Sequence, residues 1–302
     1  MFLVVTVLEV IQRSSEYLAR KGVESPRLQI ELLLAHVLQT PRLKLYLDFS
    51  RILTECELGS LRTLVQRRAA REPLQYILGT TSFCGLDLLV SREVLIPRPE
   101  TELLAEHAWE FLQQRALSGA NAPRVLDFGC GSGCLAITLA VKVPAAQVAA
   151  IDVSKAALNV ARQNALRHNV AERIQFYCGD GFAALPQPLQ FDLLLSNPPY
   201  IPTADIEKLE PELCEHEPRR ALDGGIDGLD FFRRIAAEAP PFLAPQSRIM
   251  LEFGDGQEQA IRELFRSLQW RVEAVHEDYS KVPRILIAGR HDARAARAAS
   301  GA

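Results

Sequence analysis

Short apolar runs of strand length alternate with helical stretches from Arg124 onward. The runs RVLDF, QVAAID, RIQFYC, FDLLLS and RIMLEF are separated by segments such as SKAALNVARQNALRHN, in which Ser154 is placed to cap a helix. Such alternation is typical of a mostly parallel sheet with helices on both faces. Two final runs, WRVEAVHED and RILIAGR, are separated only by a short polar connection with Pro283, so we expect an antiparallel pair at the end of the sheet. The pattern therefore predicts an α/β, Rossmann-like domain.

The residues before that domain have a helical pattern instead. Ser25 followed by Pro26 is typical of a helix start. The apolar face that follows consists of Leu28, Leu32, Leu33, Val37 and Leu38. Thr54 and Glu57 have the spacing of a capping box, which predicts another helix through about Arg71. The next segment, PLQYILGTTSFCGLDLLVS, alternates and is broken by glycines, which indicates a hairpin or an extended linker.

These patterns divide the chain into segments. A length of 302 residues is enough for about two domains. We predict a helical domain over 1–72, a hairpin linker over 73–97 and an α/β domain over 98–290, whose first helix begins near Glu100. The Ala- and Arg-rich end, 291–302, is expected to be disordered.

Composition argues against several classes of protein. The net charge is −3, with 34 Lys and Arg against 37 Asp and Glu and no long basic run, which argues against a nucleic-acid-binding protein. The apolar start MFLVVTVLEVI is short and contains Glu9, so it is neither a signal peptide nor a membrane span. The six cysteines form no CxxC pair, and Cys130 and Cys134 have no matching ligand pair, so we expect buried reduced thiols in a cytosolic protein and no zinc site.

A glycine-rich loop follows the first strand of the α/β domain. In VLDFGCGSGCLAITLA, the loop residues are Gly129, Cys130, Gly131, Ser132 and Gly133. Glycines let a ligand approach the backbone, and the start of the next helix offers free N–H groups. Because the residue after Gly133 is Cys, the spacing is GxGxG and not the GxGxxG of dinucleotide sites, which favours S-adenosylmethionine. A purely structural turn is the alternative.

Acidic residues at the next two strand ends favour the same ligand. Asp152 closes the second strand, where a carboxylate can accept hydrogen bonds from both ribose hydroxyls, although it also neighbours the helix cap Ser154. Asp180 and Gly181 follow the third strand, where the carboxylate can accept from an adenine amino group and Phe182 can lie against the ring. Asp-Gly is also a common turn. Because ligands bind at strand carboxyl ends in such sheets, the three features together predict a cofactor site.

The fourth strand ends in SNPPY, where two prolines stiffen the loop. The side-chain carbonyl of Asn197 and the backbone carbonyl of Pro198 can each accept one N–H of a planar amino group held beside the cofactor's methyl group. Pro199 and Tyr200 complete the predicted substrate site, with Tyr200 packing against the planar group. No strong general base is needed, because the nitrogen becomes acidic once methylated. A proline-stiffened strand exit without chemical function is the alternative.

Four segments together resemble the HemK/PrmC family of protein-glutamine methyltransferases. They are REPLQYILGTTSFCGLDLLVSREVLIPRPETELL, DFGCGSG, SNPPYI and HEPRRALDGGIDGLDFFRRI. The resemblance implies a class I S-adenosylmethionine-dependent methyltransferase sheet preceded by a small helical domain that docks the partner, with a β-hairpin linker. It also implies transfer of methyl to the side-chain amide nitrogen (N5) of the glutamine in the Gly-Gly-Gln motif of peptide-chain release factors, modulating translation termination and leaving S-adenosylhomocysteine.

The resemblance also assigns residues by position. Gly129 to Gly133 line the amino-acid end of the cofactor, Asp152 holds its ribose, and Asn197 to Tyr200 receive the glutamine. Arg98, Pro99, Glu100 and Thr101 match the family's PRPET stretch near the active site. Some members have Trp after the Asp of the third strand. Here the residue is Gly181, so adenine stacking shifts to Phe182 or is weaker.

Three other functions stay open. Glutamine methylation of a ribosomal protein would use the same catalytic loop, and methylation of adenine N6 in DNA would use the same NPPY segment. A binding module without activity would keep the fold but should have lost Asn197 or the glycines, which are present. We expect a cytoplasmic monomer whose partner is a release factor, with no requirement for nucleic acid or membrane.

Overall fold

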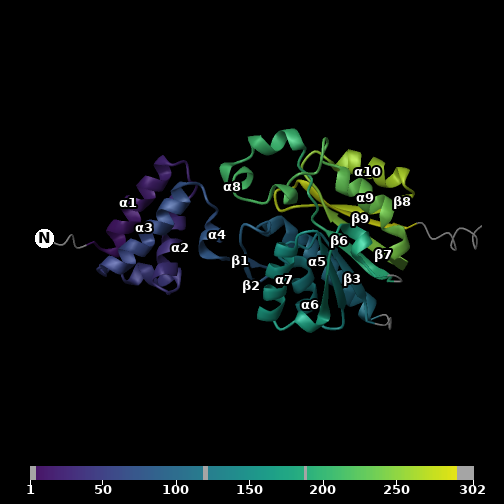
Figure 1. Ribbon diagram of the computed structural model, residues 1–302, viewed down its shortest axis with the longest axis horizontal. Helices are drawn as coiled ribbons and strands as arrows, with labels where there is room; N and C mark the ends of the chain where they lie inside the picture. Colours follow the sequence, from purple (N-terminus) through teal and green to yellow (C-terminus); the bar gives the residue numbers. More distant parts are fainter. Residues whose placement is uncertain (1–4, 118–121, 187–188, 291–302) are drawn as a thin grey trace, which may run out of the picture. The chain divides into compact units, whose positions relative to one another are not determined.

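The computed structural model describes residues 5–117, 122–186 and 189–290, and the chain forms two compact units (Figure 1). One unit is helical and comprises the chain up to Thr80 together with Glu210–His216. The other comprises Thr81–Leu209 and the chain from Glu217 onward. The segment 210–216 was predicted as part of the α/β domain, so its membership of the helical unit differs from that prediction. The predicted disordered end, 291–302, lies outside the described residues.

The helices of the first unit begin where the sequence supplies caps. They are α1 (Val7–Arg20), α2 (Pro26–Val37), α3 (Glu55–Ala69), α4 (Leu74–Leu78) and α8 (Pro211–Cys214), with the 3-10 helix η1 (Arg42–Leu47). The predicted capping box at Thr54 is present, and Thr6 forms a second one with Glu9. Pro26 begins α2 as predicted, but Ser25 has a left-handed backbone (φ 44°) and its side chain makes no capping hydrogen bond.

The segment after α3 is partly helical rather than extended. Pro73 precedes the one-turn helix α4, and Gly79 ends it with a left-handed backbone (φ 78°) and an N–H donated to Gln75. The apolar stretch between them is too short for periodicity to distinguish a helix from a strand. The predicted hairpin follows as β1 (Thr80–Phe83) and β2 (Leu86–Leu89).

Within the helical unit, α8 is held by arginines of α3 and the residues that follow it. Arg68 Nη2 donates to Glu212 Oε1 at 2.6 Å, and Arg71 donates to both oxygens of Glu212, at 2.7 and 2.6 Å. Partial burial opposes ionisation of Glu212, but the hydrogen bonds from Arg71 and Arg68 hold its pKa below the usual value. The Arg68 side chain is only 5% exposed, so this carboxylate is the anionic partner that compensates for burial of its guanidinium.

Replacing Glu212 with glutamine is expected to destabilise the helical unit by about 1–3 kcal/mol, because it leaves a buried guanidinium without its anionic partner. Hydrogen exchange of α3 peptides, read by mass spectrometry, measures this. Glu210→Gln is the matched control, since the Glu210 side chain is 72% exposed and its ion pair with Arg71 contributes little. Equal protection of α3 in the two variants would contradict the assigned role of Glu212.

The second unit is built on a seven-stranded sheet of order β5-β4-β3-β6-β7-β9-β8. Its strands are β3 (Arg124–Phe128), β4 (Gln147–Asp152), β5 (Ile174–Cys178), β6 (Phe191–Ser196), β7 (Leu243–Glu252), β8 (Trp270–Glu277) and β9 (Pro283–Arg290). Strands β3 to β7 pair in parallel, whereas β9 is antiparallel to both β7 and β8. The predicted parallel sheet and the antiparallel pair at its end are therefore confirmed.

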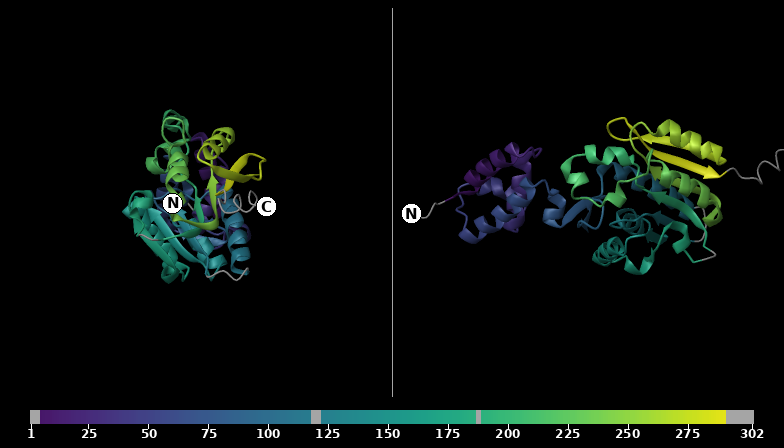
Figure 2. Two further views of the ribbon diagram at one scale, coloured as in Figure 1. Left: turned by 90° about the vertical axis from the view of Figure 1, so that its right-hand side faces the viewer. Right: turned by 45° about the horizontal axis from the view of Figure 1, so that its top comes forward.

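Each face of this sheet has its own apolar layer, because side chains alternate along a strand. Val125 packs with α5 (Pro99–Leu117), α6 (Cys134–Lys142) and α7 (Lys155–Arg167). The next residue, Leu126, packs on the opposite face with α9 (Asp230–Glu238) and α10 (Glu258–Ser267). Both views of Figure 2 keep the teal helices and the yellow-green helices on separate sides of the sheet.

The remaining elements are short helical turns, most of them next to the carboxyl ends of the strands. They are η2 (Ala171–Arg173), η3 (Gly181–Ala184), η4 (Thr203–Lys208), η5 (Arg219–Ala221) and η6 (Pro240–Phe242). Since β3, β4, β5 and β6 are parallel and adjacent, the loops that follow them meet at one edge of the sheet. The four stretches that the sequence singled out therefore come together.

Candidate active site

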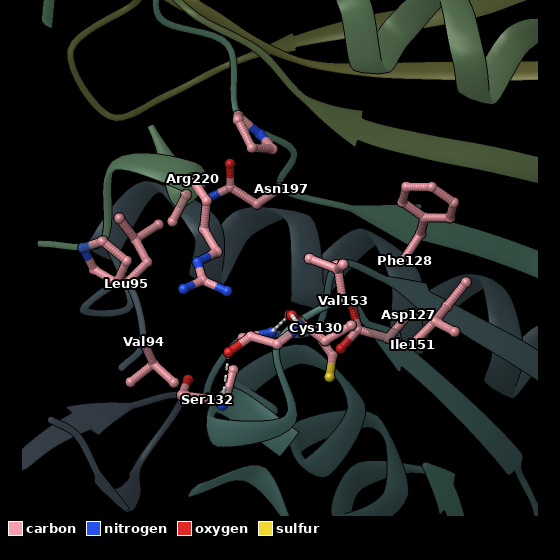
Figure 3. Close-up of a pocket in the computed structure, with 18 of the residues that line it drawn as sticks. Val94, Leu95, Asp127, Phe128, Cys130, Ser132, Ile151, Val153, Asn197 and Arg220 are labelled. Atoms are coloured by element: carbon pink, nitrogen blue, oxygen red, sulfur yellow. Dashed lines mark hydrogen bonds between the residues drawn. The ribbon is translucent and has the colours of Figure 1, made fainter. Parts of the chain in front are cut away.

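A cavity opens at that edge, within the second unit (Figure 3). Its walls include the glycine loop, the ends of β4 and β5, the NPPY loop and part of α9. Ten of the predicted site residues line it: Gly129, Cys130, Gly131, Ser132, Asp152, Asp180, Gly181, Asn197, Pro199 and Thr101 of the PRPET stretch. Arg220 extends its guanidinium into the space between Asn197 and the glycine loop (Figure 3).

The glycine loop needs glycines for two different reasons. Gly131 has a left-handed backbone (φ 52°), and a Cβ there would meet no atom within 4 Å, so its surface is open to a ligand. Gly133 (φ 80°) does not line the cavity; a Cβ there would lie 3.0 Å from Ala161 Cβ on α7. The first position thus exposes backbone to the cavity, and the second lets α6 pack closely against α7.

Asp152 holds the glycine loop in place. Its Oδ2 accepts a hydrogen bond from Gly131 N at 2.9 Å, and its Oδ1 accepts from Ser154 N at 2.7 Å. Ser154 in turn caps α7 through Ala157 N, as predicted. Because each carboxylate oxygen can accept a second hydrogen bond, Asp152 keeps acceptor capacity toward the cavity.

Asp127 lines the cavity but was not among the site residues predicted from the sequence. It lies in β3, is 1% exposed, and its Oδ2 accepts from Ala136 N at 2.9 Å. Its Oδ1 is buried and, among the described residues, has no hydrogen-bond partner. Burial raises the pKa of Asp127 to about 7, against the effect of the Ala136 hydrogen bond and together with the charge of Asp152. A buried acceptor of this kind suits a cationic ligand group such as an ammonium.

The raised pKa of Asp127 predicts a stability that falls with increasing pH. Below the unfolded-state pKa of about 3.9 both states bind the proton; between there and about 7 only the folded state keeps it, so its stabilising contribution is lost as pH rises through about 7. Asp127→Asn should therefore reduce the slope of unfolding free energy between pH 4 and 7 by about 1 kcal/mol per pH unit.

Urea unfolding without cofactor, followed by tryptophan fluorescence, measures this slope. Both tryptophans, Trp109 and Trp270, lie in the second unit, so the signal reports that unit. Asp87→Asn, at an exposed position, is the control. An unchanged slope in Asp127→Asn would contradict the assignment.

The third strand end differs from the prediction. Phe182 is 3% exposed and packs between the rings of Phe128 and Phe242 in the core, so it does not line the cavity. The reason is the left-handed backbone of Gly181 (φ 63°), after which the chain turns inward in η3. The prediction that Phe182 lies against an adenine ring is therefore wrong.

Helix α9 supplies the side chains that face the cavity here. Arg234 pairs with the Asp180 side chain and donates to its backbone oxygen at 2.9 Å. A Cβ at Gly181 would lie 2.7 Å from Arg234 Nη2, so a larger residue here would displace the Arg234 guanidinium. Phe231 also lines the cavity and provides the aromatic surface that was expected from Phe182. No local pattern distinguishes Phe231 from the buried Phe232 beside it.

The NPPY loop presents Asn197 to the cavity and buries Pro198. Asn197 and Pro199 line the cavity, whereas Pro198 and Tyr200 do not. Asn197 Nδ2 donates to Thr101 Oγ1 at 3.0 Å, which joins the NPPY loop to the PRPET stretch. Within the described part of the chain, no side-chain hydrogen bond involves the amide oxygen of Asn197.

Tyr200 is fixed by the loops around it. Gln257 Nε2 donates to its backbone oxygen at 2.9 Å, and a Cβ at Gly254 would lie 3.0 Å from its ring. A Cβ at Gly224 would lie 2.8 Å from Pro199 O, so the backbone at Gly224 also packs directly on this loop. Burial and the charge of Glu252 raise the pKa of Tyr200 to about 12, so its hydroxyl stays protonated. In this arrangement Tyr200 supports the loop from behind and is not part of the cavity wall.

An ion pair joins two of the other motif stretches. Arg98 Nη2 donates to both carboxylate oxygens of Glu217, each at 2.8 Å. Burial raises the pKa of Glu217, and the charge of Arg98 opposes that rise. The two residues are far apart in sequence, so their pairing was not predictable from either stretch. The ion pair joins the PRPET stretch to the HEPRRAL stretch.

Comparison with known proteins identifies the family. The profile of the PrmC N-terminal domain matches residues 9–79, and that of the methyltransferase small domain matches residues 102–225. The release factor glutamine methyltransferase of Geobacter sulfurreducens is 48% identical over 260 residues, covering 86% of this chain and 88% of that protein. The chain belongs to the release factor glutamine methyltransferase family. This confirms the resemblance drawn from its motifs.

A second family member, from Chlorobaculum tepidum, is 43% identical over 284 residues and covers 93% of this chain and 96% of its own. Among solved structures, the hMettl16 catalytic domain in complex with MAT2A 3'UTR hairpin 6 has a TM-score of 0.51 at 18% identity, covering 81% of this chain and 86% of that one. That likeness shows the methyltransferase fold alone.

Two further features complete the description of the family member. Across 5–117, 122–186 and 189–290, no group of His, Cys, Asp and Glu side chains is arranged to hold a metal ion. Every helix in those ranges is too short or too polar to span a bilayer. No disulfide joins any of the described cysteines, and Cys56 and Cys178 are exposed, contrary to the prediction that all are buried.

Proposed function

We propose that this chain transfers a methyl group from S-adenosylmethionine to the side-chain amide nitrogen of the glutamine in the Gly-Gly-Gln motif of a peptide-chain release factor. The observation that carries the proposal is the position of Asn197, whose side chain lines the same cavity as the glycine loop and Asp152 and faces that loop across it. Family membership supplies the substrate class, since the relatives are named release factor glutamine methyltransferases.

The charges and the open backbone of the cavity support this choice of cofactor. S-adenosylmethionine supplies an electrophilic methyl group on a sulfonium sulfur. Asp127, with its unpartnered Oδ1 among the described residues, is suited to the ammonium group, and Asp152 is suited to the ribose hydroxyls. Open backbone at Gly129 and Gly131 allows close approach. Phe231, Asp180 and Gly181 form the wall that we assign to adenine.

The substrate nitrogen needs help because its lone pair is delocalised into the amide carbonyl. The Asn197 side-chain oxygen is assigned to accept one N–H group and, although Pro198 does not line the cavity, its backbone oxygen is assigned to accept the other. These two contacts favour the positive charge that develops as the nitrogen is methylated and aim the nitrogen at the methyl group. The proton then leaves to solvent, since the methylated nitrogen is acidic. In this scheme Tyr200 acts by holding the loop rather than by stacking on the substrate.

The helical unit is proposed to dock the release factor, in keeping with the match of residues 9–79 to the PrmC N-terminal domain. Catalytic residues alone do not distinguish a release factor from a ribosomal protein, because both would present a glutamine amide. A competition assay tests the choice: purified release factor, a ribosomal protein and duplex DNA are offered together with labelled S-adenosylmethionine. Label mainly in the release factor is expected; label in either competitor instead would reject the proposed substrate.

A further inference from the structure

Two hydrogen bonds, the first part-buried and the second buried, run from Asn197 into the interior of the second unit. Asn197 Nδ2 donates to Thr101 Oγ1 at 3.0 Å, and Thr101 Oγ1 donates to Glu252 Oε2 at 2.6 Å. Thr101 is 1% exposed and Glu252 is 2% exposed. The three residues come from the loop after β6, the first turn of α5 and the end of β7, so the tertiary fold assembles the chain of bonds.

The chain of bonds has a direction. A threonine hydroxyl has one proton, and the Glu252 carboxylate, which is ionised above a pKa of about 7, then only accepts hydrogen bonds. The Thr101 proton is therefore directed to Glu252, and the Thr101 oxygen is left to accept from Asn197. If the Asn197 amide were reversed, its oxygen would face the Thr101 oxygen with no proton between them. A buried polar group left unpaired in this way costs about 1–3 kcal/mol.

We infer that Thr101 and Glu252 are positioning residues that hold the Asn197 amide with its NH₂ group turned inward and its carbonyl oxygen available to the substrate. The inference rests on the proposed function, in which that oxygen accepts an N–H of the substrate amide. If the Asn197 amide were free to rotate by half a turn, its NH₂ group would face the N–H group of the substrate amide for part of the time. Fixing its orientation in advance removes that loss from each catalytic cycle.

The buried surroundings of Glu252 disfavour its charged carboxylate. Burial raises the pKa of Glu252 to about 7, while the Thr101 hydrogen bond and the charges of Arg284 and Arg98 lower it and Glu100 raises it. Tyr200, whose pKa Glu252 raises in turn, lies beside it. Burying a carboxyl group in such surroundings costs free energy, which a purely structural role does not explain. Its contact with Thr101 provides a reason for its presence directly behind the catalytic loop.

Thr101→Val tests the inference because valine keeps the shape of threonine and removes the hydroxyl. We expect kcat for methyl transfer to fall about 10–100-fold, while KM for the release factor and the Kd for S-adenosylhomocysteine stay within about threefold. Thr101→Ser, which restores the hydroxyl, should recover most of the lost kcat. Thr138→Val, at a second fully buried threonine that lies in α6, is the matched control and should behave as wild type.

Wild-type kcat in Thr101→Val, or equal losses in the valine and serine variants, would overturn the inference. Should Thr101→Val not fold, Glu252→Gln decides, because a carboxamide can meet Thr101 as donor or acceptor and no longer enforces one direction. A loss of about fivefold or more in kcat is expected for that variant, and unchanged kcat would reject the role of Glu252.

A substrate-free readout separates this inference from the proposed function. The side-chain NH₂ signals of Asn197, identified by their absence in Asn197→Ala, should exchange slowly with solvent in the wild type and rapidly in Thr101→Val. Identical signals and exchange rates in the two proteins would overturn the positioning role. If the wild type shows the protected amide but methylates no release factor, the proposed function fails while the positioning of Asn197 stands.

Discussion

Replacing Asn197 with alanine is expected to lower kcat for methyl transfer about 100-fold or more, because the variant loses the oxygen assigned to the substrate amide. Asn197 lies on the cavity wall at the end of β6, and its side chain is the polar group that the stiff NPPY loop presents there. Binding of S-adenosylhomocysteine should change little, since the cofactor is assigned to the glycine loop, Asp127 and Asp152. Calorimetry for binding and a methyl-transfer assay for turnover measure the two effects separately.

Asn159→Ala provides the matched control for this substitution. Asn159 is exposed on α7 and does not line the cavity, so turnover should equal that of the wild type. If Asn197→Ala also turned over at the wild-type rate, Asn197 would not be catalytic. If it lost cofactor binding and turnover together, its main role would be in the cofactor site instead.

Replacing Asp152 with alanine is expected to raise the Kd for S-adenosylhomocysteine about 100-fold or more. Two losses combine: the acceptors assigned to the ribose hydroxyls, and the hydrogen bonds that Asp152 makes to Gly131 N and Ser154 N. Hydrogen bonds to a charged group are worth about 1.5–3 kcal/mol each, and every 1.4 kcal/mol is a tenfold change in Kd. Calorimetric titration measures the change directly.

Glu172→Ala, at an exposed carboxylate in η2, controls for the loss of one negative charge and should bind as the wild type does. If Asp152→Ala kept wild-type affinity, the Asp152 carboxylate would not bind the cofactor, and its only role in the wild type would be to hold the glycine loop. Thermal unfolding of the variant in the absence of ligand shows whether that role alone matters for stability.

Much of the fold was predictable because its signals are local. The strand-length apolar runs in the second unit each became a strand, and the final antiparallel pair followed from the short connection before Pro283. Capping at Thr54 and Ser154 needs only a few neighbouring residues, so it too was predictable. The glycine loop, Asp152 and Asn197 meet at one edge because parallel strands carry their carboxyl ends there.

Other parts of the site depend on contacts between distant segments, which local patterns do not reveal. In the sequence, Glu252 is an ordinary polar residue at a strand end. Its hydrogen bond with Thr101 depends on the tertiary fold. Likewise, Arg98 gave no indication of its pairing with Glu217. The Phe182 prediction was wrong because it assumed a straight continuation after Asp180, whereas Gly181 turns the chain so that the ring enters the core.

The two short helices α4 and α8 were difficult to predict for other reasons. Helix α4 is five residues long, too short for a helical period to show, and its sequence also alternates as a strand would. Helix α8 belongs to the helical unit although nearly 130 residues separate it from the rest of that unit, and its attachment depends on Glu212 meeting Arg68 and Arg71. Charge alone did not single out these residues among 34 basic and 37 acidic ones.

The most direct test of the central claim uses radiolabelled S-adenosylmethionine, the purified chain, and a bacterial-type release factor in two forms. One form carries the Gly-Gly-Gln motif and the other carries Gly-Gly-Ala. The account predicts label in the first form, none in the second, and loss of label when Asn197→Ala replaces the wild-type enzyme. Equal labelling of both forms, or no labelling of either by an enzyme that binds S-adenosylhomocysteine, would contradict it.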